Sequence, residues 1–256
     1  MADIVFVIPA YNEGANIGQL LEGVDAASRL ESSGRCRVLV GDDGSTDQTP
    51  QILRDFARHI PLESVRHPVN LGAGRAFLSG FKRALEVTQP DDIIVTMEAD
   101  NTGDWGILPR MIQQTRNGCD IALASCYVRE GRVEGTTWWR QILSRTANGM
   151  LRIVCPIPGV RTYSSFYRAY RQDILRRAME MYGDDLIRER GFTCMLELLM
   201  KLQTLKPRIT EIPMILRCQL RKGKSKMKVG PTIAAYFRLM GRHLLKRDVW
   251  SPRGTM

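Results

Sequence analysis

Residues 93–105 read Ile-Ile-Val-Thr-Met-Glu-Ala-Asp-Asn-Thr-Gly-Asp-Trp, an apolar run that ends in a cluster of carboxylates. The run predicts a buried strand, and Glu98 and Asp100 follow where that strand must end. An extended backbone would point both carboxylates to the same side, because they are two residues apart. Neighbouring like charges favour a cation between them, and Mg²⁺ or Mn²⁺ accepts one or two protein carboxylates together with substrate phosphates. The alternative is a strand that runs into an acidic, solvated turn.

The composition bounds the class of protein. A chain of 256 residues is long enough for one large domain. Its 44% hydrophobic and 25% charged residues argue against a disordered or an integral membrane protein. No apolar run is long enough to span a bilayer, and the first one, which ends at Ile8, is too short for a signal peptide. The cysteines form no C-x-x-C pair and the histidines are dispersed, so we expect a cytoplasmic protein without zinc or disulfides.

Positive charge is concentrated near the C-terminus. The net charge is +10, and residues 212–247 contain no Asp or Glu. The basic residues of that range are Arg217, Arg221, Lys222, Lys224, Lys226, Lys228, Arg238, Arg242, Lys246 and Arg247. Such a segment can hold phosphates, an anionic membrane surface or nucleic acid, and charge alone does not choose among them.

Strand and helix patterns alternate along the first half of the chain. The strand-like runs are 3–9, 37–41 and 62–66, and the helix-like segments are 16–30, 49–58 and 75–87. This alternation predicts an open, mostly parallel α/β sheet with helices on both faces. In the second half we expect helices at 108–115, 138–153, 173–181 and 192–205 and a strand at 120–127.

Several chemically useful residues fall at the predicted strand ends, where ligands bind such sheets. They are Tyr11, Glu13, Asp42, Asp43, Glu98 and Asp100. Their convergence favours a binding site over a solvated turn. The glycine-containing loop at 70–75 is better explained as a backbone turn at a helix start than as a dinucleotide cradle, since it follows the third strand and lacks the third glycine.

Four short motifs carry a family resemblance. They are Ile-Pro-Ala-Tyr-Asn-Glu at 8–13, Gly-Asp-Asp-Gly-Ser-Thr-Asp at 41–47, Asn-Leu-Gly at 70–72 and Glu-Ala-Asp at 98–100. In this order they resemble family 2 of the inverting glycosyltransferases, over residues 4 to about 230, which implies the GT-A fold. Further matches are most similar to the polyprenyl-phosphate sugar transferases, which include the dolichol-phosphate mannose synthases. These matches are 125–127, Arg140, Ser144, Asn148, 191–192, Glu197 and 223–227.

The resemblance implies roles for individual residues. Glu98 and Asp100 would hold Mg²⁺ or Mn²⁺ at the donor's diphosphate, and Arg140 and Ser144 would bind the acceptor's phosphate; these four are the expected catalytic residues. The expected nucleotide-sugar-binding residues are Pro9, Tyr11, Glu13, Val40, Asp42, Ala99, Arg221 and Lys226. The donor would be of the GDP-mannose or UDP-glucose type.

The chain departs from the family pattern around the acceptor. Cys126 replaces an Arg that would contact the acceptor's phosphate, a charge-assisted contact worth ~1.5 to 3 kcal/mol. Segment 161–166 lacks the family's usual Asp and Gly. The arginines considered as compensation are Arg129, Arg132 and Arg161.

Two further departures concern the donor side. Glu98 stands where the family usually has Asp, and the expected Arg before Gly223 is Leu220, so Arg221 fits with a shift of one residue. A hydroxyl acceptor would also need a base, whereas a phosphate acceptor would not. The candidate bases are Asp184, Asp185 and Glu197.

We expect a transferase domain at 1–230, with a nucleotide-sugar half at about 1–105 and an acceptor half at 106–230, followed by a basic amphipathic segment at 231–256. Within this segment, 232–245 has apolar residues at helical spacing. Such a helix can lie on an anionic membrane with Trp250 at the headgroups, or dock on the core with its basic side outward.

The favoured function is transfer of one sugar from a nucleotide diphosphate sugar to a polyprenyl phosphate lipid, by a protein at the cytoplasmic face of a membrane. Transfer to a sugar or another hydroxyl acceptor is the alternative. An NAD-dependent oxidoreductase would need a complete G-x-G-x-x-G after the first strand. A non-catalytic nucleic-acid-binding protein would leave the acidic strand ends unexplained, and no nucleic acid partner is expected.

Overall fold

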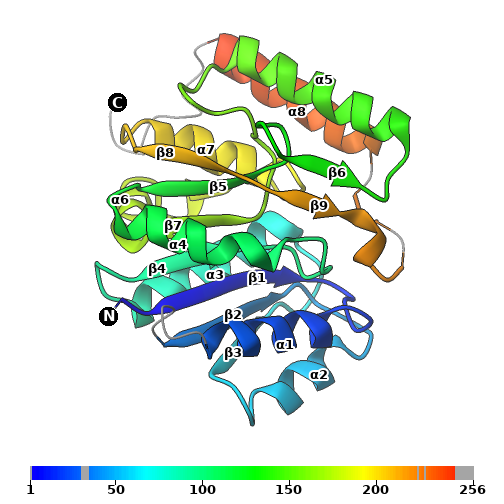
Figure 1. Cartoon of the computed structure of the whole chain (residues 1–256), viewed down its shortest axis with the longest axis vertical. Helices are drawn as coiled ribbons and strands as arrows, with labels where there is room; N and C mark the ends of the chain where they lie inside the picture. Colours follow the sequence, from blue (N-terminus) through cyan, green and yellow to red (C-terminus); the bar gives the residue numbers. More distant parts are fainter. Residues whose placement is uncertain (1, 30–34, 224, 228, 246–256) are drawn as a thin grey trace.

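A seven-stranded sheet organises the computed structural model, which describes residues 2–29, 35–223, 225–227 and 229–245 (Figure 1). The strand order is β3-β2-β1-β4-β7-β5-β8. Neighbouring strands are parallel except at β7, which is antiparallel to both β4 and β5. The strands are β1 Ile4–Ala10, β2 Cys36–Asp42, β3 Leu62–Arg66, β4 Ile93–Thr96, β5 Ile121–Ser125, β7 Arg168–Arg171 and β8 Ile209–Pro213. The prediction of a mostly parallel α/β sheet is confirmed.

Helices cover both faces of this sheet (Figure 1). They are α1 Ile17–Ser28, α2 Thr49–Phe56, α3 Ala73–Val87, α4 Leu108–Arg116, α5 Trp138–Val154, α6 Gln172–Tyr182, α7 Cys194–Gln203 and α8 Val229–Leu244. The 3-10 helices are η2 Trp105–Ile107, η3 Gly183–Leu186 and η4 Cys218–Leu220. Each helix expected from the sequence is present, with its ends shifted by a few residues.

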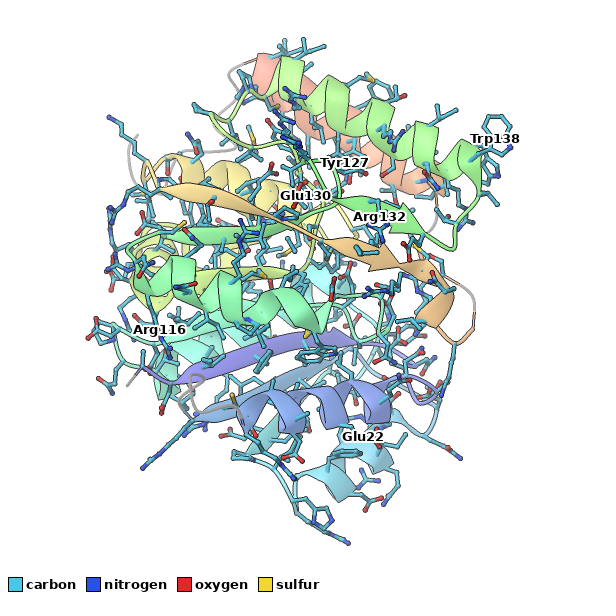
Figure 2. The ribbon with its side chains drawn as sticks, viewed as in Figure 1. Glu22, Arg116, Tyr127, Glu130, Arg132 and Trp138 are labelled. Atoms are coloured by element: carbon cyan, nitrogen blue, oxygen red, sulfur yellow. The ribbon has the colours of Figure 1, made fainter. Side chains whose placement is uncertain are left out.

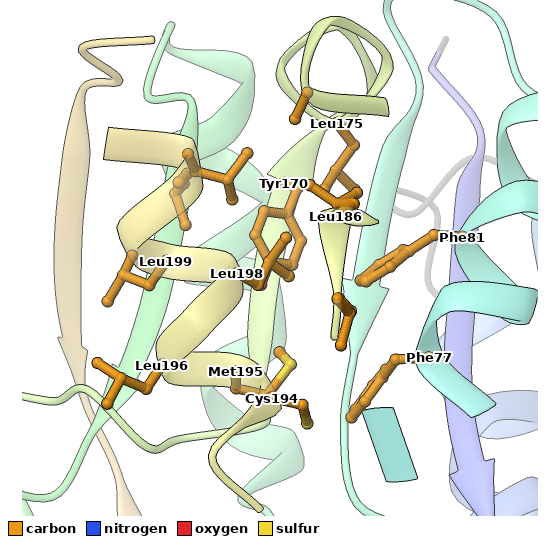
Figure 3. Close-up of a cluster of buried hydrophobic side chains, with 14 of the residues drawn as sticks. Phe77, Phe81, Tyr170, Leu175, Leu186, Cys194, Met195, Leu196, Leu198 and Leu199 are labelled. Carbon is orange, nitrogen blue, oxygen red and sulfur yellow. The ribbon is translucent and has the colours of Figure 1, made fainter. Parts of the chain in front are cut away.

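Two hydrophobic clusters lie on opposite faces of the sheet, and β1 contributes to both. Val5 and Val7 belong to the cluster that includes residues of α3, α6 and α7, part of which is shown in Figure 3. Phe6 and Ile8 belong to the cluster that includes residues of α1 and α4. Successive side chains of a strand point to opposite faces, so a strand that is covered on both sides must be apolar throughout.

Four strands were not predicted, because their sequences are short or polar. They are β7, β8 and the two parallel strands of a small second sheet, β6 Arg132–Glu134 and β9 Ile215–Arg217. The β7 sequence is Arg-Ala-Tyr-Arg, yet Arg168 is fully buried. Its guanidinium donates to the carbonyl oxygens of Ser165 at 2.7 Å, Tyr163 at 2.8 Å and Met195 at 2.9 Å. These bonds compensate the desolvation that makes a buried Arg rare.

Helix α8 docks on the core and lies beside α5 at the edge of the molecule farthest from α2 (Figure 1). Ala235 is buried, and Leu239 and Met240 belong to the hydrophobic cluster of α3, α6 and α7. Phe237 and Leu244 remain exposed on the other side of the helix. Trp250 lies outside the described residues. None of the helices in the described part of the chain has the length and apolar character that crossing a bilayer requires.

Candidate active site

A cavity of about 1760 Å³ opens beyond the carboxyl ends of β1, β2 and β4. Its walls come from the loops after these strands, from segment 188–193, from residues 221–223 and 225–226, and from α8. The predicted site residues that line it are Pro9, Tyr11, Glu13, Glu98, Ala99, Asp100, Arg221 and Lys226. Residues from distant parts of the chain therefore meet at the sheet edge where the sequence predicts a ligand.

Glu98 and Asp100 lie together in the cavity wall, just after β4. One Asp100 oxygen, Oδ1, accepts from the Thr102 hydroxyl at 2.7 Å and the Thr102 backbone N–H at 3.1 Å. The other, Oδ2, accepts from Nε of Arg221 at 2.6 Å and also pairs with its Nη2. Burial and the nearby Asp100 raise the pKa of Glu98 to about 8, against the opposing effect of Arg221. This wall therefore favours additional positive charge.

Residues 221–223 and 225–226 line the cavity together with the acidic pair and contact its wall at further points. The side chain of Asn16 binds the backbone of Lys222 twice, accepting from its N–H at 2.8 Å and donating to its carbonyl oxygen at 3.0 Å. Lys226 donates to Oε1 of Glu13 at 2.5 Å. The basic residues that the resemblance assigned to the donor's phosphates thus lie in the cavity, each paired with a carboxylate.

Val40 and Asp42 lie behind the cavity wall rather than on it. Val40 is fully buried within β2. The Asp42 carboxylate accepts from the Ser45 backbone N–H at 2.9 Å and lies 3.5 Å from Nε of Arg66. Asp42 therefore stabilises the turn after β2.

Asp43, one of the strand-end residues expected at a binding site, lines the cavity where Asp42 does not, although the resemblance assigned it no role. Its carboxylate accepts from the backbone N–H groups of Leu71 at 2.8 Å and Gly72 at 2.7 Å, and contacts Nδ1 of His67 at 2.8 Å. Gly72 has φ +97°, and a Cβ atom at this position would lie 2.4 Å from the carbonyl oxygen of Arg190, so a side chain would not fit there. The interpretation of 70–75 as a backbone turn before a helix is confirmed.

Arg140 and Ser144 lie on α5, and neither is among the residues that line the cavity. The Arg140 guanidinium lies over the Trp139 ring, 5.2 Å from its centroid. The Ser144 hydroxyl is hydrogen-bonded to the Tyr127 hydroxyl at 2.5 Å, below α5 in Figure 2. The role of both residues at the acceptor's phosphate stays a prediction.

The proposed bases Asp184, Asp185 and Glu197 do not line the cavity either. Glu197 is 1% exposed. Its Oε1 accepts from Lys201 at 2.6 Å, and its Oε2 accepts from the backbone N–H groups of Arg188 at 2.8 Å and Glu189 at 2.7 Å. Glu197 therefore holds the cavity-lining segment 188–193 in place, which is a structural role.

A second group of cavity-lining charges was missed. Arg188, Glu189, Arg190, Arg238 and Arg242 line the cavity from segment 188–193 and from α8. The spacing of Arg238 and Arg242 could have indicated that they act together, since residues four apart share one face of a helix. Their meeting with segment 188–193 could not be read from the sequence.

Among the described residues, no three His, Cys, Asp or Glu side chains are grouped so that they could hold a metal ion. Glu98 and Asp100 form a pair of hard oxygen donors, which is as many protein ligands as Mg²⁺ commonly takes when phosphates and water complete its shell. The residues present thus fit a metal that is shared with a diphosphate.

Comparison with known proteins gives the following likenesses. The family profile described as "Glycosyl transferase family 2" matches residues 5–178. The chain is 30% identical to a dolichol-phosphate mannosyltransferase of Pyrococcus furiosus, over 95% of this chain and 63% of that protein. It is 31% identical to a polyprenol monophosphomannose synthase of Mycolicibacterium smegmatis, over 67% of this chain and 62% of that protein. The chain thus spans about three fifths of the length of these two relatives.

Two further likenesses extend this comparison. The chain is 29% identical to an undecaprenyl-phosphate mannosyltransferase of Micrococcus luteus, over 89% of this chain and 88% of that protein. A solved structure of glucosyl-3-phosphoglycerate synthase from Mycobacterium tuberculosis, in complex with Mn²⁺, UDP and its product, has a TM-score of 0.63 at 20% identity and covers 96% of this chain and 80% of that one. The GT-A-type fold expected from the sequence is confirmed by this likeness.

Proposed function

Because this chain belongs to glycosyl transferase family 2, we propose that it moves one sugar from a nucleotide diphosphate sugar to a phosphate-bearing acceptor. The observation that carries the proposal is the cavity at the strand ends, which gathers an acidic pair, two paired cations and an aromatic residue, Tyr11. The named relatives act on dolichol, polyprenol and undecaprenyl phosphates, which supports a polyprenyl phosphate as the acceptor. The donor would be of the GDP-mannose or UDP-glucose type.

The donor's nucleoside would bind along the wall formed by Pro9, Tyr11 and Glu13, with Ala99 near the ribose. A carboxylate such as Glu13 can accept hydrogen bonds from base N–H groups or ribose hydroxyls. Val40 and Asp42 would act from behind this wall, by fixing β2 and the turn after it.

Glu98 and Asp100 are the residues that would hold Mg²⁺ or Mn²⁺ at the donor's diphosphate. The metal would supply positive charge that stabilises the departing nucleoside diphosphate. Arg221 contacts Asp100 Oδ2, and Lys226 contacts Glu13, so both cations lie at the same wall and would contact the donor's phosphates from there. All these contacts act on the leaving group rather than on the acceptor.

The transfer itself would need no base from the protein. A phosphate oxygen of the acceptor forms a bond to C1 of the sugar, the bond between C1 and the diphosphate oxygen breaks, and its electron pair leaves with the nucleoside diphosphate. An acceptor phosphate is already ionised at neutral pH.

We also propose that α5 and α8 together form the face that meets an anionic membrane at its cytoplasmic side. Trp138, Trp139 and Ile142 are exposed on α5, and Phe237 and Leu244 are exposed on α8. Figure 2 shows Trp138 projecting from the outer end of α5. Apolar side chains among basic ones are typical of helices that lie in a membrane interface.

Titration calorimetry with GDP and UDP, each with and without Mn²⁺, tests the donor half of the proposal. We expect Mn²⁺-dependent binding of one nucleotide. Transfer from the matching sugar nucleotide to a short-chain prenyl phosphate, against a free sugar as acceptor, tests the other half. Product with the free sugar alone would replace the lipid-phosphate acceptor with the hydroxyl alternative, and no nucleotide binding would overturn both halves.

A further inference from the structure

We propose that Arg238 and Arg242 of α8 hold the acceptor's phosphate, and that Glu189 occupies this subsite in the absence of the acceptor. The inference rests on the proposed function, because it assumes a phosphate-bearing acceptor. It places the acceptor's phosphate at the part of the cavity that is lined by segment 188–193 and α8.

Glu189 lies between the two arginines and is itself 8% exposed. Its Oε2 accepts from Nη2 of Arg238 at 2.8 Å and from the Thr193 hydroxyl at 3.0 Å, and its Oε1 lies 3.7 Å from Nη1 of Arg242. The arginine side chains are 53% and 40% exposed, and all three charged residues line the cavity. One carboxylate thus contacts two guanidinium groups that are open to a ligand.

The charges in this part of the cavity do not balance. Two guanidinium groups share one carboxylate, so a positive charge remains. A phosphate monoester carries about −1.5 to −2 charge at pH 7, and guanidinium groups bind phosphate oxygens in pairs. An acceptor phosphate would therefore match this subsite better than Glu189 alone does.

The position of the subsite suits an acceptor rather than the donor's diphosphate. The diphosphate has the wall of Glu98 and Asp100, with a metal and Arg221 to neutralise it. In an inverting transfer the attacking oxygen approaches C1 from the side opposite the leaving group, so the acceptor's phosphate needs cations elsewhere in the cavity. Phe166 and Phe192 line the cavity as well, with ring centroids 5.5 Å apart, and supply apolar atoms to its lining.

The subsite would also make up for the guanidinium missing at Cys126. Arg140 and Ser144 stay outside the cavity lining, whereas Arg238 and Arg242 are part of it. Because α8 packs against α5, the pair Arg238 and Arg242 and the pair Arg140 and Ser144 lie on adjoining helices. Substitutions in α8 distinguish the first pair from the second.

The backbone of Glu189 is held independently of its carboxylate, so an acceptor phosphate would displace the carboxylate without displacing the segment. Its backbone N–H donates to Oε2 of Glu197 at 2.7 Å, and Glu197 is paired with the buried Lys201. The carboxylate therefore competes with the acceptor for the same two arginines. Removing its charge should strengthen acceptor binding.

The first experiment measures KM for a short-chain prenyl phosphate, dispersed in detergent, with saturating donor and Mn²⁺. We expect Arg238→Gln and Arg242→Gln each to raise this KM by about tenfold or more, since each removes a charge-assisted contact. Arg152→Gln is the matched control, because Arg152 is an exposed α5 arginine outside the cavity lining. It should change KM less than twofold, and all variants should keep Mn²⁺-dependent nucleotide binding.

The second experiment uses Glu189→Gln, for which a structural role and the proposed role predict opposite results. The amide keeps an acceptor for Thr193 but loses the charge, so we expect a lower KM for the prenyl phosphate. An unchanged or higher KM would contradict the competition between Glu189 and the acceptor. A collapse of kcat at unchanged KM would instead identify Glu189 as a base and overturn the subsite.

Two comparisons complete the test. If glycerol 3-phosphate inhibits competitively with the prenyl phosphate, and inhibits less in Arg238→Gln, the subsite accepts phosphate monoesters generally. If only the prenyl phosphate depends on the arginines, the subsite is specific for the lipid headgroup. Unchanged KM in the double variant Arg238→Gln/Arg242→Gln, with nucleotide binding intact, would overturn the inference alone. Failure of the wild-type protein to bind any nucleoside diphosphate would overturn the proposed function instead.

Discussion

Asp100 is the residue on which the proposed donor chemistry depends most. Its Oδ1 is fixed by Thr102 and its Oδ2 faces Arg221 in the cavity. Glu98 is its like-charged neighbour, and its longer side chain is less suited to the near-octahedral geometry of Mg²⁺ than an Asp would be. Asp104 lies outside the cavity lining and accepts from the Gly106 backbone N–H at 3.1 Å.

These placements predict a graded series of variants. Asp100→Asn should abolish Mn²⁺-dependent binding of nucleoside diphosphate, Glu98→Gln should weaken it, and Asp104→Asn should leave it nearly unchanged. Each change keeps the size of the side chain and removes one ionisable carboxyl group, so the series isolates the carboxylates. Titration calorimetry on folded variants is the measurement, and metal dependence like that of the wild type in Asp100→Asn would show that Asp100 does not hold the metal.

At the scale of elements, Asp47 joins the loop after β1 to the start of α2. Its Oδ1 accepts from the Thr49 hydroxyl at 2.6 Å and the Thr49 backbone N–H at 2.9 Å, and its Oδ2 accepts from the Gly14 backbone N–H at 2.9 Å. Burial alone would raise the pKa of Asp47, but these hydrogen bonds outweigh it and lower the pKa below its usual 3.8. The ionised carboxylate is thus bound more favourably in the folded state.

Asp47→Ala should therefore lower the free energy of unfolding at pH 7 by about 1 kcal/mol, since it removes the hydrogen bonds to Thr49 and Gly14. A lowered pKa means that the unfolded state takes up the proton first, so the stabilisation is lost as pH falls through the folded-state pKa below 3.8. Urea unfolding of both proteins at pH 7 and pH 3 should show a smaller difference at pH 3. An equal difference at both values would mean that the carboxylate's charge is not what stabilises this junction.

The α5 and α8 pair predicts membrane binding through side chains rather than through the whole segment. Deleting residues 232–256 would remove Leu239 and Met240 from the core, so point substitutions are the better test. Trp138→Gln combined with Phe237→Gln should weaken binding to anionic vesicles several-fold, because both side chains are exposed at 74% and 54%. Vesicle sedimentation at low salt is the measurement.

Val69→Gln is a matched control for this double variant, since Val69 is 59% exposed on the loop after β3, far along the chain from both helices. It should bind vesicles as the wild type does. A wild-type protein that ignores anionic vesicles even at low salt would leave α8 as a helix that only docks on the core.

At the scale of the whole molecule, one cavity is lined both by the carboxylates of the strand ends and by the arginines of segment 188–193 and α8. A donor with its metal at the carboxylates and a phosphate acceptor at the arginines would occupy both parts of this lining. Ligands that bind only the folded state stabilise it, by about 2.7 kcal/mol at 100 times the Kd. Nucleoside diphosphate with Mn²⁺ should therefore raise the Tm, and EDTA should reverse the rise.

The Tm of the apo protein should not respond to EDTA, which serves as the control. The described fold contains no group of three metal-ligating side chains, and two hydrophobic clusters hold it together. A fall in apo Tm on chelation would indicate a metal that supports the fold, which the proposed function does not include.

The sequence alone determined the alternating strands and helices and the acidic strand ends. These features are local: a strand covered on both faces must be apolar at every position, as β1 is, and a carboxylate after such a strand must lie at the sheet edge. The resemblance added the donor-site residues, because its motifs are also short and contiguous. For the same reason the sequence predicted the strands β1, β2 and β4 individually, but it did not show which strands lie next to one another in the sheet.

Only the tertiary structure decided what lies opposite those strand ends. Strand β7 is charged at both ends and enters the sheet antiparallel between β4 and β5, where carbonyl oxygens from elsewhere in the fold satisfy Arg168. Arg221 meets Asp100 across 121 residues of chain, and Arg238 meets Glu189 across 49. Long-range charge pairs leave no periodic signal in the sequence, because their geometry depends on how helices pack on the finished sheet.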